Sequence, residues 1–214
     1  TVPFKERVLD VLDAIEPGAE RIGAVNTLVF RDGALHGSNT DAPGFVRAVE
    51  ERGRTLRGAR VTILGAGGSA RAIAAGVADA GARSVCLLNR TVSRAEAVAT
   101  ALDDGKTAFE AGPLDDFPDA VANTDLIVVT VAAAGLPAVR ALDTACVPPG
   151  ALWVDINYWS VPGQLEHELA ARGIEIGDGL GMLIHQGALA FEAFTGLPAS
   201  PATAWQALRG GTEP

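Results

Sequence analysis

From residue 60 onward, hydrophobic and polar positions alternate in blocks rather than residue by residue. Four apolar runs occupy residues 60–64, 84–88, 125–131 and 151–156. Segments with helical periodicity occupy residues 68–80, 93–102 and 162–171. Strands that alternate with helices are typical of a parallel sheet with helices on both faces, whose buried strands are continuously apolar, as DLIVVTV and ALWVDI are. We therefore predict an α/β fold with a doubly wound parallel sheet.

The first 53 residues have a different pattern. The spacing of apolar residues predicts an amphipathic helix over residues 4–15. Two short β-prone runs flank Asp32-Gly33, a dipeptide that suits the tight turn of a hairpin. A second helix is predicted from Pro43 to Gly53, because proline favours the start of a helix and glycine its end. These elements are too few to bury a core of their own, so we expect them to pack on other parts of the molecule.

Composition and charge exclude several classes of protein. The chain has 214 residues, is 48% hydrophobic and carries a formal net charge of −9. Such a charge repels nucleic acid and anionic membranes. The sequence contains no apolar stretch long enough to cross a bilayer and no signal-peptide pattern at its start. We expect a soluble, cytoplasmic protein that binds neither nucleic acid nor membrane.

The cysteines indicate a reducing environment. Cys86 and Cys146 both lie among apolar residues, and neither has a Cys or His at the spacing of a metal-ligand pair. We therefore expect neither a disulfide scaffold nor a metal site.

The segment VTILGAGGSARAIAAGV places glycines between an apolar run and a helix. Gly65, Gly67 and Ala70 occupy the positions of the G-x-G-x-x-G/A motif of dinucleotide-binding proteins. The first glycine permits a tight turn, the second lets the pyrophosphate approach the backbone, and Ala70 allows close packing of helix on strand. The start of the helix offers free N–H groups to the phosphates. A purely structural glycine-rich turn is the alternative.

The end of the next strand indicates which dinucleotide is bound. NAD-binding proteins usually carry an acidic residue there, whereas this chain has Asn89, Arg90 and Thr91, followed by Arg94. A guanidinium binds a 2′-phosphate through charge-assisted hydrogen bonds, and the neutral side chains add donors. We therefore predict NADP as the cofactor. The alternative is that Arg90 simply begins the next helix in solvent.

A nicotinamide-dependent reaction also needs a group that moves a proton. The candidate side chains are Lys5, Asp41, Tyr158, His36, His167 and His185. We expect His36 on the hairpin and His167 on a polar helix to be solvated, and His185 to point away from its neighbour Gln186.

Six blocks of sequence cover most of the chain in this order: TVPFK, GAVNTLV, GSNTDAPGF, GAGGSARA, NRT and GMLIHQGALAFEAFTG. Together they resemble the shikimate dehydrogenase family. The resemblance implies a Rossmann-like domain and NADPH-dependent reduction of 3-dehydroshikimate to shikimate in the aromatic amino-acid pathway. It also implies that Lys5 and Asp41 form the catalytic pair, that Asn26 and Gln186 hold substrate hydroxyls, and that Tyr158 lines the substrate site.

The same resemblance implies three segments in the chain. These are part of a substrate-binding domain over residues 1–53, an NADP-binding domain over 54–177, and C-terminal helices over 178–214 that pack back and close the cleft. To the cofactor we further assign Ala66, Gly68, Ser69, Ile156 and Gly179. The oligomeric state is expected to be a monomer or a homodimer.

The chemistry of these residue types is consistent with the roles that the resemblance implies. An ammonium beside a ring ketone stabilises the developing alkoxide and delivers its proton, and a carboxylate orients that ammonium. The alternatives are an exposed helix cation for Lys5 and an ordinary N-cap for Asp41. The alternative for Asn26 is a polar residue that satisfies backbone groups, and the alternative for Gln186 is a half-buried amide. The alternative for Tyr158 is simple packing beside Trp159.

Three departures from the family pattern affect this interpretation. The segment WSVPGQLEHEL after Tyr158 lacks the family's usual spacing of Pro and Thr. TVAAAG stands where the family usually has an Asn-Ala-Thr/Ser stretch, so we expect altered cofactor affinity or geometry. The family's first segment, with two serines for the substrate carboxylate, has no counterpart before TVPFK, so we expect either an incomplete chain or a pocket open on one side. A relative that acts on quinate or an aminoshikimate, and a catalytically silent NADP-binding protein, remain alternatives.

Overall fold

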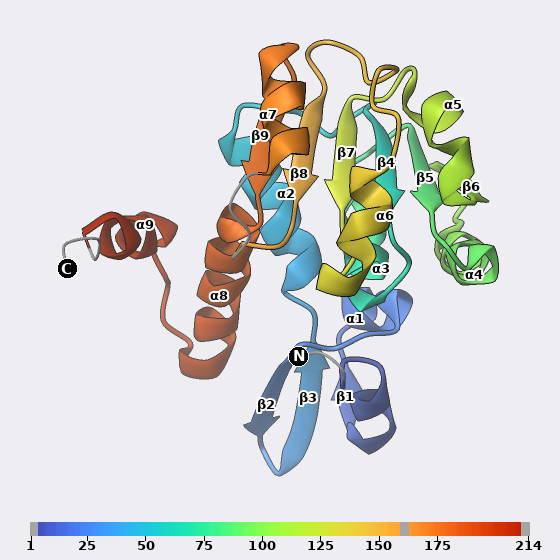
Figure 1. Ribbon diagram of the computed structural model, residues 1–214. Helices are drawn as coiled ribbons and strands as arrows, with labels where there is room; N and C mark the ends of the chain where they lie inside the picture. The colour runs from blue at the N-terminus through green and yellow to red at the C-terminus, as the bar shows by residue number, and fades with distance from the viewer. Residues whose placement is uncertain (1–3, 159–162, 211–214) are drawn as a thin grey trace.

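The fold is built around one large parallel sheet (Figure 1). The structure is a computed structural model that describes residues 4–158 and 163–210. The six strands are β4 (Arg60–Leu64), β5 (Ser84–Leu88), β6 (Ala108–Gly112), β7 (Leu126–Val129), β8 (Leu152–Asp155) and β9 (Glu175–Asp178). All pairs are parallel, in the order β6-β5-β4-β7-β8-β9. This is the doubly wound Rossmann order, so the predicted fold class is confirmed.

Helices cover both faces of this sheet and form two apolar layers. One layer includes α3 (Gly68–Asp79) and α4 (Val92–Leu102), and the other includes α5 (Phe117–Val121), α6 (Leu136–Arg140) and α7 (Gln164–Ala171). Two short 3-10 helices, η2 (Leu114–Asp116) and η3 (Ala133–Gly135), precede α5 and α6. Ile63, Ile127 and Trp153 are fully buried in these layers, and each such side chain contributes about 1.5–3 kcal/mol of transfer free energy. The apolar central strands therefore anchor the sheet.

The two edge strands were not predicted from the sequence. In β6 and β9, polar and exposed positions interrupt the apolar run, as Glu110 and Asp178 show. An edge strand has a partner on one side only and can expose one row of side chains. The continuous apolar pattern that identifies the central strands is therefore missing at the edges.

A smaller sheet of three strands, in the order β1-β3-β2, accompanies the large one. Its strands are β1 (Ala14–Ile15), β2 (Thr27–Arg31) and β3 (Ala34–Ser38). The hairpin expected at Asp32-Gly33 is confirmed, since both residues have positive φ, 54° and 80°, between the antiparallel strands β2 and β3. Figure 1 shows this sheet at the lower end of the molecule.

The helix predicted over residues 4–15 is wrong. The chain forms a short 3-10 helix, η1 (Arg7–Val11), becomes extended at Leu12, and enters β1 before α1 (Pro17–Ile22). Asp13 explains the change, because its N–H donates to Leu35 O at 3.0 Å and its carboxylate accepts from Leu35 N at 2.7 Å. Pairing with β3 thus overrides the helical spacing.

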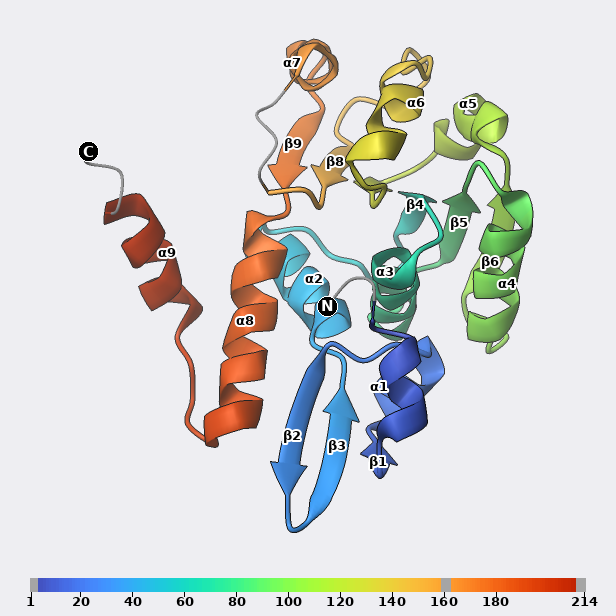
Figure 2. The same cartoon turned by 60° about the horizontal axis from the view of Figure 1, so that its bottom comes forward.

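Helix α2 (Asp41–Glu51) connects the two sheets and packs between two other helices. It packs against α3 and α8 (Leu180–Thr195). Two glycines permit this close packing: a Cβ on Gly76 would lie 2.9 Å from Ala42 O, and one on Gly44 would lie 2.8 Å from the backbone N of Gln186. Figure 2 shows α8 beside α2, with α9 (Pro201–Gly210) on the outer side of α8. Helix α8 therefore packs back on the first segment, as predicted, and α9 packs on α8.

Two further sequence expectations can be compared with the fold. Both cysteines are free thiols. Across residues 4–158 and 163–210, none of the helices combines the length and apolar character that a membrane span requires.

Candidate active site

A cleft of about 450 Å³ opens at the carboxyl ends of β7 and β8, between these strands, α2 and α8. This is where doubly wound sheets bind ligands. Eight predicted site residues line it: Lys5, Asn26, Asp41, Ser69, Ile156, Tyr158, Gly179 and Gln186. The fold therefore brings every residue assigned to catalysis or substrate binding to one cavity, although these residues come from opposite ends of the chain.

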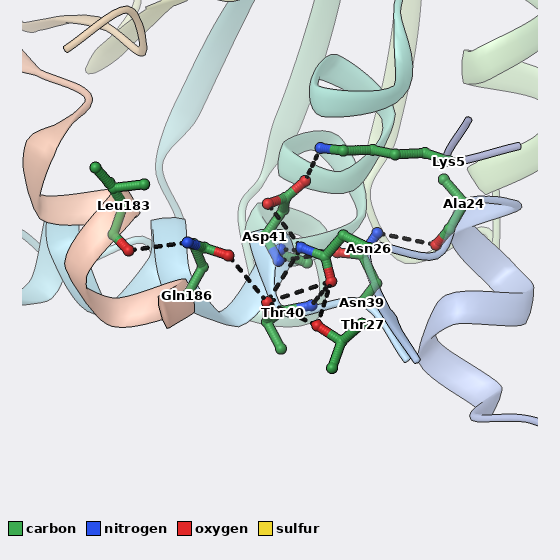
Figure 3. A network of polar contacts seen from close by, with 10 residues as sticks. Lys5, Ala24, Asn26, Thr27, Asn39, Thr40, Asp41, Leu183 and Gln186 are labelled. Atoms are coloured by element: carbon green, nitrogen blue, oxygen red, sulfur yellow. Dashed lines mark hydrogen bonds and ion pairs between the residues drawn. The ribbon is translucent and has the colours of Figure 1, made fainter. Parts of the chain in front are cut away.

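Two of the residues that line the cleft, Lys5 and Asp41, form an ion pair (Figure 3). Their side chains are only 12% and 8% exposed. The backbone N–H of Val25 donates to Lys5 O at 2.8 Å, which fixes the segment that carries the lysine. Lys5 lies outside any helix and is largely buried, so the alternative of an exposed helix cation is wrong.

The carboxylate of Asp41 does not cap its own helix. The helix begins at Asp41, and the side chain of Asn39 caps it by accepting from the N–H groups of Asp41 at 3.0 Å and Ala42 at 3.3 Å. Asn39 also donates to Ala24 O at 2.9 Å. The alternative of an N-cap role for Asp41 is therefore wrong, and the carboxylate remains available for Lys5 and Asn26.

Asn26 connects the start of α2 with β2. Its Nδ2 donates to Asp41 Oδ1 at 2.9 Å and to Thr40 Oγ1 at 3.1 Å. Its Oδ1 accepts from the Thr40 N–H at 3.0 Å and from the Thr27 hydroxyl at 2.8 Å. Asn26 thus satisfies a backbone group, as its alternative interpretation required, and also holds the carboxylate of Asp41 in place.

Thr40, which the sequence analysis did not single out, hydrogen-bonds to two residues that line the cleft, Asn26 and Gln186. It is 5% exposed, and its hydroxyl donates to Gln186 Oε1 at 3.4 Å, which links α2 to α8. Gln186 is half-buried and donates to Leu183 O at 3.0 Å. The sequence did contain a signal for Thr40. Asn39 and Thr40 are both residue types that cap helices, and they stand together before a helix, so that when Asn39 caps the helix the Thr40 side chain can make another contact.

The remaining candidates for proton transfer differ in exposure. Tyr158 lines the cleft and is 46% exposed, whereas Trp159, its suggested packing partner, lies outside the described residues. His36 and His167 are exposed, as predicted. His185 is buried and faces Glu51, with 3.2 Å between Nε2 and Oε2, so it points away from the cleft as predicted.

The glycine turn has the backbone geometry of a dinucleotide site. Gly65 has a φ of +120°, which L side chains rarely adopt, and Ala70 is fully buried against the strand. A Cβ on Gly67 would have no neighbour within 4 Å, so its backbone is open to a ligand. A Cβ on Gly68 would lie 3.7 Å from Lys5 Cδ, which places the lysine stem against the start of α3. Ala66 and Ser69 complete the turn, and these residues fit a pyrophosphate.

The residues assigned to the 2′-phosphate lie at the end of the neighbouring strand and do not line the cleft. The N–H of Gly65 donates to Leu88 O at 2.8 Å, so the end of β5 adjoins the glycine turn. Asn89 donates to Thr91 O at 2.9 Å and shapes this corner. Arg90 and Arg94 are both exposed. Their exposure fits both a role in binding the 2′-phosphate and the alternative of solvated side chains.

The TVAAAG stretch lines one side of the cleft with mainly apolar side chains, and hydrogen bonds of Thr130 and Asn157 hold it in place. Val131 and Ala132 line the cleft together with Thr130. Asn157, also missed by the sequence analysis, is 7% exposed and donates from Nδ2 to Val131 O at 3.1 Å and to Asp155 Oδ1 at 2.7 Å. Burial raises the pKa of Asp155, partly offset by its hydrogen bonds from Asn157.

Comparison with known proteins identifies the family. The family model described as shikimate / quinate 5-dehydrogenase matches residues 47–175. The shikimate dehydrogenase substrate binding domain matches residues 1–28, and the C-terminal domain matches 179–209. The chain belongs to the shikimate dehydrogenase family. Among its relatives is shikimate dehydrogenase (NADP(+)) of Geobacillus kaustophilus, 38% identical over 92% of this chain and 71% of the relative.

Solved structures of this family share the fold. Shikimate 5-dehydrogenase of Thermus thermophilus, in complex with NADP(H) and shikimate, superposes with a TM-score of 0.83 at 36% identity, covering 98% of this chain and 77% of that one. Quinate dehydrogenase of Corynebacterium glutamicum in complex with NAD gives a TM-score of 0.86 at 29% identity, with 98% and 76% covered. Shikimate dehydrogenases and their relatives thus differ in substrate and cofactor on one architecture.

Proposed function

We propose that this protein is an NADP-dependent oxidoreductase that interconverts 3-dehydroshikimate and shikimate. The observation that carries the proposal is the Lys5–Asp41 ion pair in a cleft beside the glycine turn. The side chain of Lys5 lies beside Gly68, since a Cβ on Gly68 would be 3.7 Å from Lys5 Cδ. This proximity of the proton donor to the glycine turn supports a reaction between substrate and cofactor at this place. The NADP- and shikimate-bound relative supports the same pairing of substrate and cofactor.

NADP would lie along the carboxyl edge of β4 and β5. The backbone of Gly65–Ala70 would hold the pyrophosphate, with Asn89, Arg90, Thr91 and Arg94 at the adenosine 2′-phosphate. Ile156 and Gly179 line the same cleft as the Lys5–Asp41 pair and would face the nicotinamide. When bound, the cofactor supplies or accepts the hydride.

The proton transfer falls to Lys5. In the direction of reduction, its ammonium stabilises the negative charge that develops on the carbonyl oxygen and then delivers the proton to it. Asp41 holds the ammonium in place and accepts a hydrogen bond from a substrate hydroxyl. In the reverse direction the same pair takes up the hydroxyl proton.

The substrate hydroxyls have partners on both walls of the cleft. Asn26 and Gln186 both hydrogen-bond to Thr40, so their amides lie close enough to bind two hydroxyls of one ring. Tyr158 adds a ring and a hydroxyl to the lining of the cleft. We further propose the three-segment organisation given above, a cytoplasmic location, and a monomer or homodimer.

A steady-state assay tests this function. We would follow reduced nicotinamide by absorbance with shikimate and quinate as substrates, each with NADP+ and NAD+. Turnover that is fastest with shikimate and NADP+ is expected. The same assay on a form extended upstream shows whether further sequence completes the pocket.

Two other results of that assay would each support a different function. Preference for quinate would assign the chain to the quinate branch of its family, which the similarity to quinate dehydrogenase makes a specific competitor. NADP+ binding without turnover of either substrate, in both forms, would contradict the oxidoreductase proposal and favour a silent NADP-binding protein.

A further inference from the structure

Thr130 lies where the direction of winding of the sheet reverses. The strands β4 and β7 are neighbours in the sheet, and the cofactor crevice of a doubly wound fold opens between them. Thr130 follows β7 directly, and its hydroxyl donates to Leu64 O at 2.8 Å. The same oxygen accepts the Thr130 N–H at 2.9 Å. One residue thus makes two hydrogen bonds to the carbonyl that precedes the glycine turn.

These bonds act on the first peptide group of that turn. The Leu64–Gly65 peptide is held through its oxygen by Thr130 and through its N–H by Leu88 O at 2.8 Å. A Cβ on Gly65 would lie only 2.3 Å from Thr130 Oγ1, so the hydroxyl lies directly against the turn. The path of the chain from Gly65 into α3 therefore starts from a peptide plane that is fixed by strands on both sides.

The segment that carries Thr130 is itself anchored. Asn157, at the end of β8, donates to Val131 O at 3.1 Å, and its second hydrogen bond goes to the carboxylate of Asp155. Thr130 is thus supported from the side opposite to β4. A rigid support is what a side chain needs in order to orient another loop.

We propose that Thr130 is a positioning residue for NADP, which acts by fixing the Leu64–Gly65 peptide so that the glycine turn presents its backbone to the pyrophosphate. This inference rests on the proposed use of NADP and deepens it. Thr130 makes no chemical step. Its loss weakens cofactor binding and leaves the Lys5–Asp41 pair intact.

Three variants separate the hydroxyl from the rest of the side chain. Thr130→Val replaces the hydroxyl by a methyl group, Thr130→Ala removes both branches, and Thr130→Ser keeps the hydroxyl. In each of them Leu64 O retains the backbone N–H bond, so no buried carbonyl is left without a partner and the variants are expected to fold. Thr62→Val is the matched control, because it removes another threonine hydroxyl of the same sheet, which is buried in β4 at 3.2 Å from Thr124 Oγ1.

Calorimetric titration with NADP+ gives a readout besides activity. We expect the Kd for NADP+ to rise about three- to tenfold in Thr130→Val and Thr130→Ala and to stay within about twofold in Thr130→Ser. KM for NADP+ should rise in parallel, while kcat and KM for shikimate stay nearly constant. Thr62→Val should lower Tm by about 2–4 °C without changing the Kd.

The outcomes distinguish the two proposals. Wild-type protein that does not bind NADP+ contradicts the proposed function itself. Wild-type binding with an unchanged Kd in Thr130→Val and Thr130→Ala overturns the role of Thr130 alone. A Kd that rises equally in Thr130→Ser and Thr130→Ala also overturns it, because the hydroxyl would then not be the group responsible.

Discussion

Lys5 and Asp41, from two different segments of the chain, form an ion pair within the cleft with side chains 12% and 8% exposed. Burial of both charges is costly unless they are paired and hydrogen-bonded. Asn26 supplies a further hydrogen bond to Asp41. A fold that maintains such a pair beside the glycine turn has an arrangement suited to proton transfer.

Replacement of Lys5 separates catalysis from cofactor binding. Lys5→Ala should lower kcat by about 10²–10⁴-fold, the usual contribution of general acid–base catalysis, because no ammonium then reaches the carbonyl oxygen. The Kd for NADP+ should change little, since the glycine turn keeps its backbone. Steady-state kinetics and calorimetric titration measure the two quantities.

The control for this prediction is the second lysine of the sequence. Lys106 is exposed and lies outside the cleft, so Lys106→Ala should have wild-type kinetics. Wild-type turnover in Lys5→Ala would refute the proposed role of the ion pair.

Arg90 tests the preference for NADP over NAD. Arg90→Ala should raise the Kd for NADP+ by about ten- to a hundredfold, because a charge-assisted hydrogen bond to the 2′-phosphate is lost, and leave the Kd for NAD+ unchanged. Arg83→Ala, an exposed arginine next to the opposite end of β5, is the control. Equal effects on both cofactors would place Arg90 away from the 2′-phosphate.

The two glycines of the turn should respond differently to the same change. Gly65→Ala forces a side chain into a φ of +120° and against Thr130, so it should lower the free energy of unfolding by about 1–3 kcal/mol. Gly67→Ala meets no atom within 4 Å and should leave stability within about 0.5 kcal/mol. It should nevertheless weaken NADP+ binding, because the methyl group occupies the approach of the pyrophosphate. Denaturant unfolding and titration test both; unaltered binding in Gly67→Ala would count against a cofactor at this turn.

Asp155 should produce a measurable pH dependence of stability. Burial raises the pKa of its carboxyl above the ordinary 3.8, against the opposing effect of Asn157. Between the ordinary pKa of 3.8 in the unfolded chain and the raised pKa in the folded protein, the unfolded chain has already lost the proton that the folded protein still holds. The free energy of unfolding therefore falls as pH rises through this range. Asp155→Asn stays neutral and keeps an oxygen for the Asn157 N–H groups. Its Tm relative to wild type should therefore increase with pH across that window and then level off; a constant difference would exclude this effect.

Local chemistry explains why much of the fold was predictable. The apolar runs of β4, β5, β7 and β8, the turn at Asp32-Gly33 and the glycine motif each depend on residues that are close in sequence. The same locality explains the error over residues 4–15, where helical spacing was outweighed by pairing of Asp13 with Leu35. The edge strands β6 and β9 were missed because their exposed positions interrupt the apolar pattern.

The sequence by itself determined the α/β class and the position of the glycine turn, because backbone preference and hydrophobic pattern are local. The candidate catalytic and substrate-binding side chains came from the resemblance to the family. Only the tertiary structure decided that Asn39 caps α2 and thereby leaves Asp41 to Lys5, that Thr40 joins Asn26 to Gln186, and that Thr130 holds Leu64. These relationships depend on how the elements meet in space. Each of these contacts joins residues that are brought together by the packing of helices and strands. The spacing of residues along the sequence does not reveal such packing.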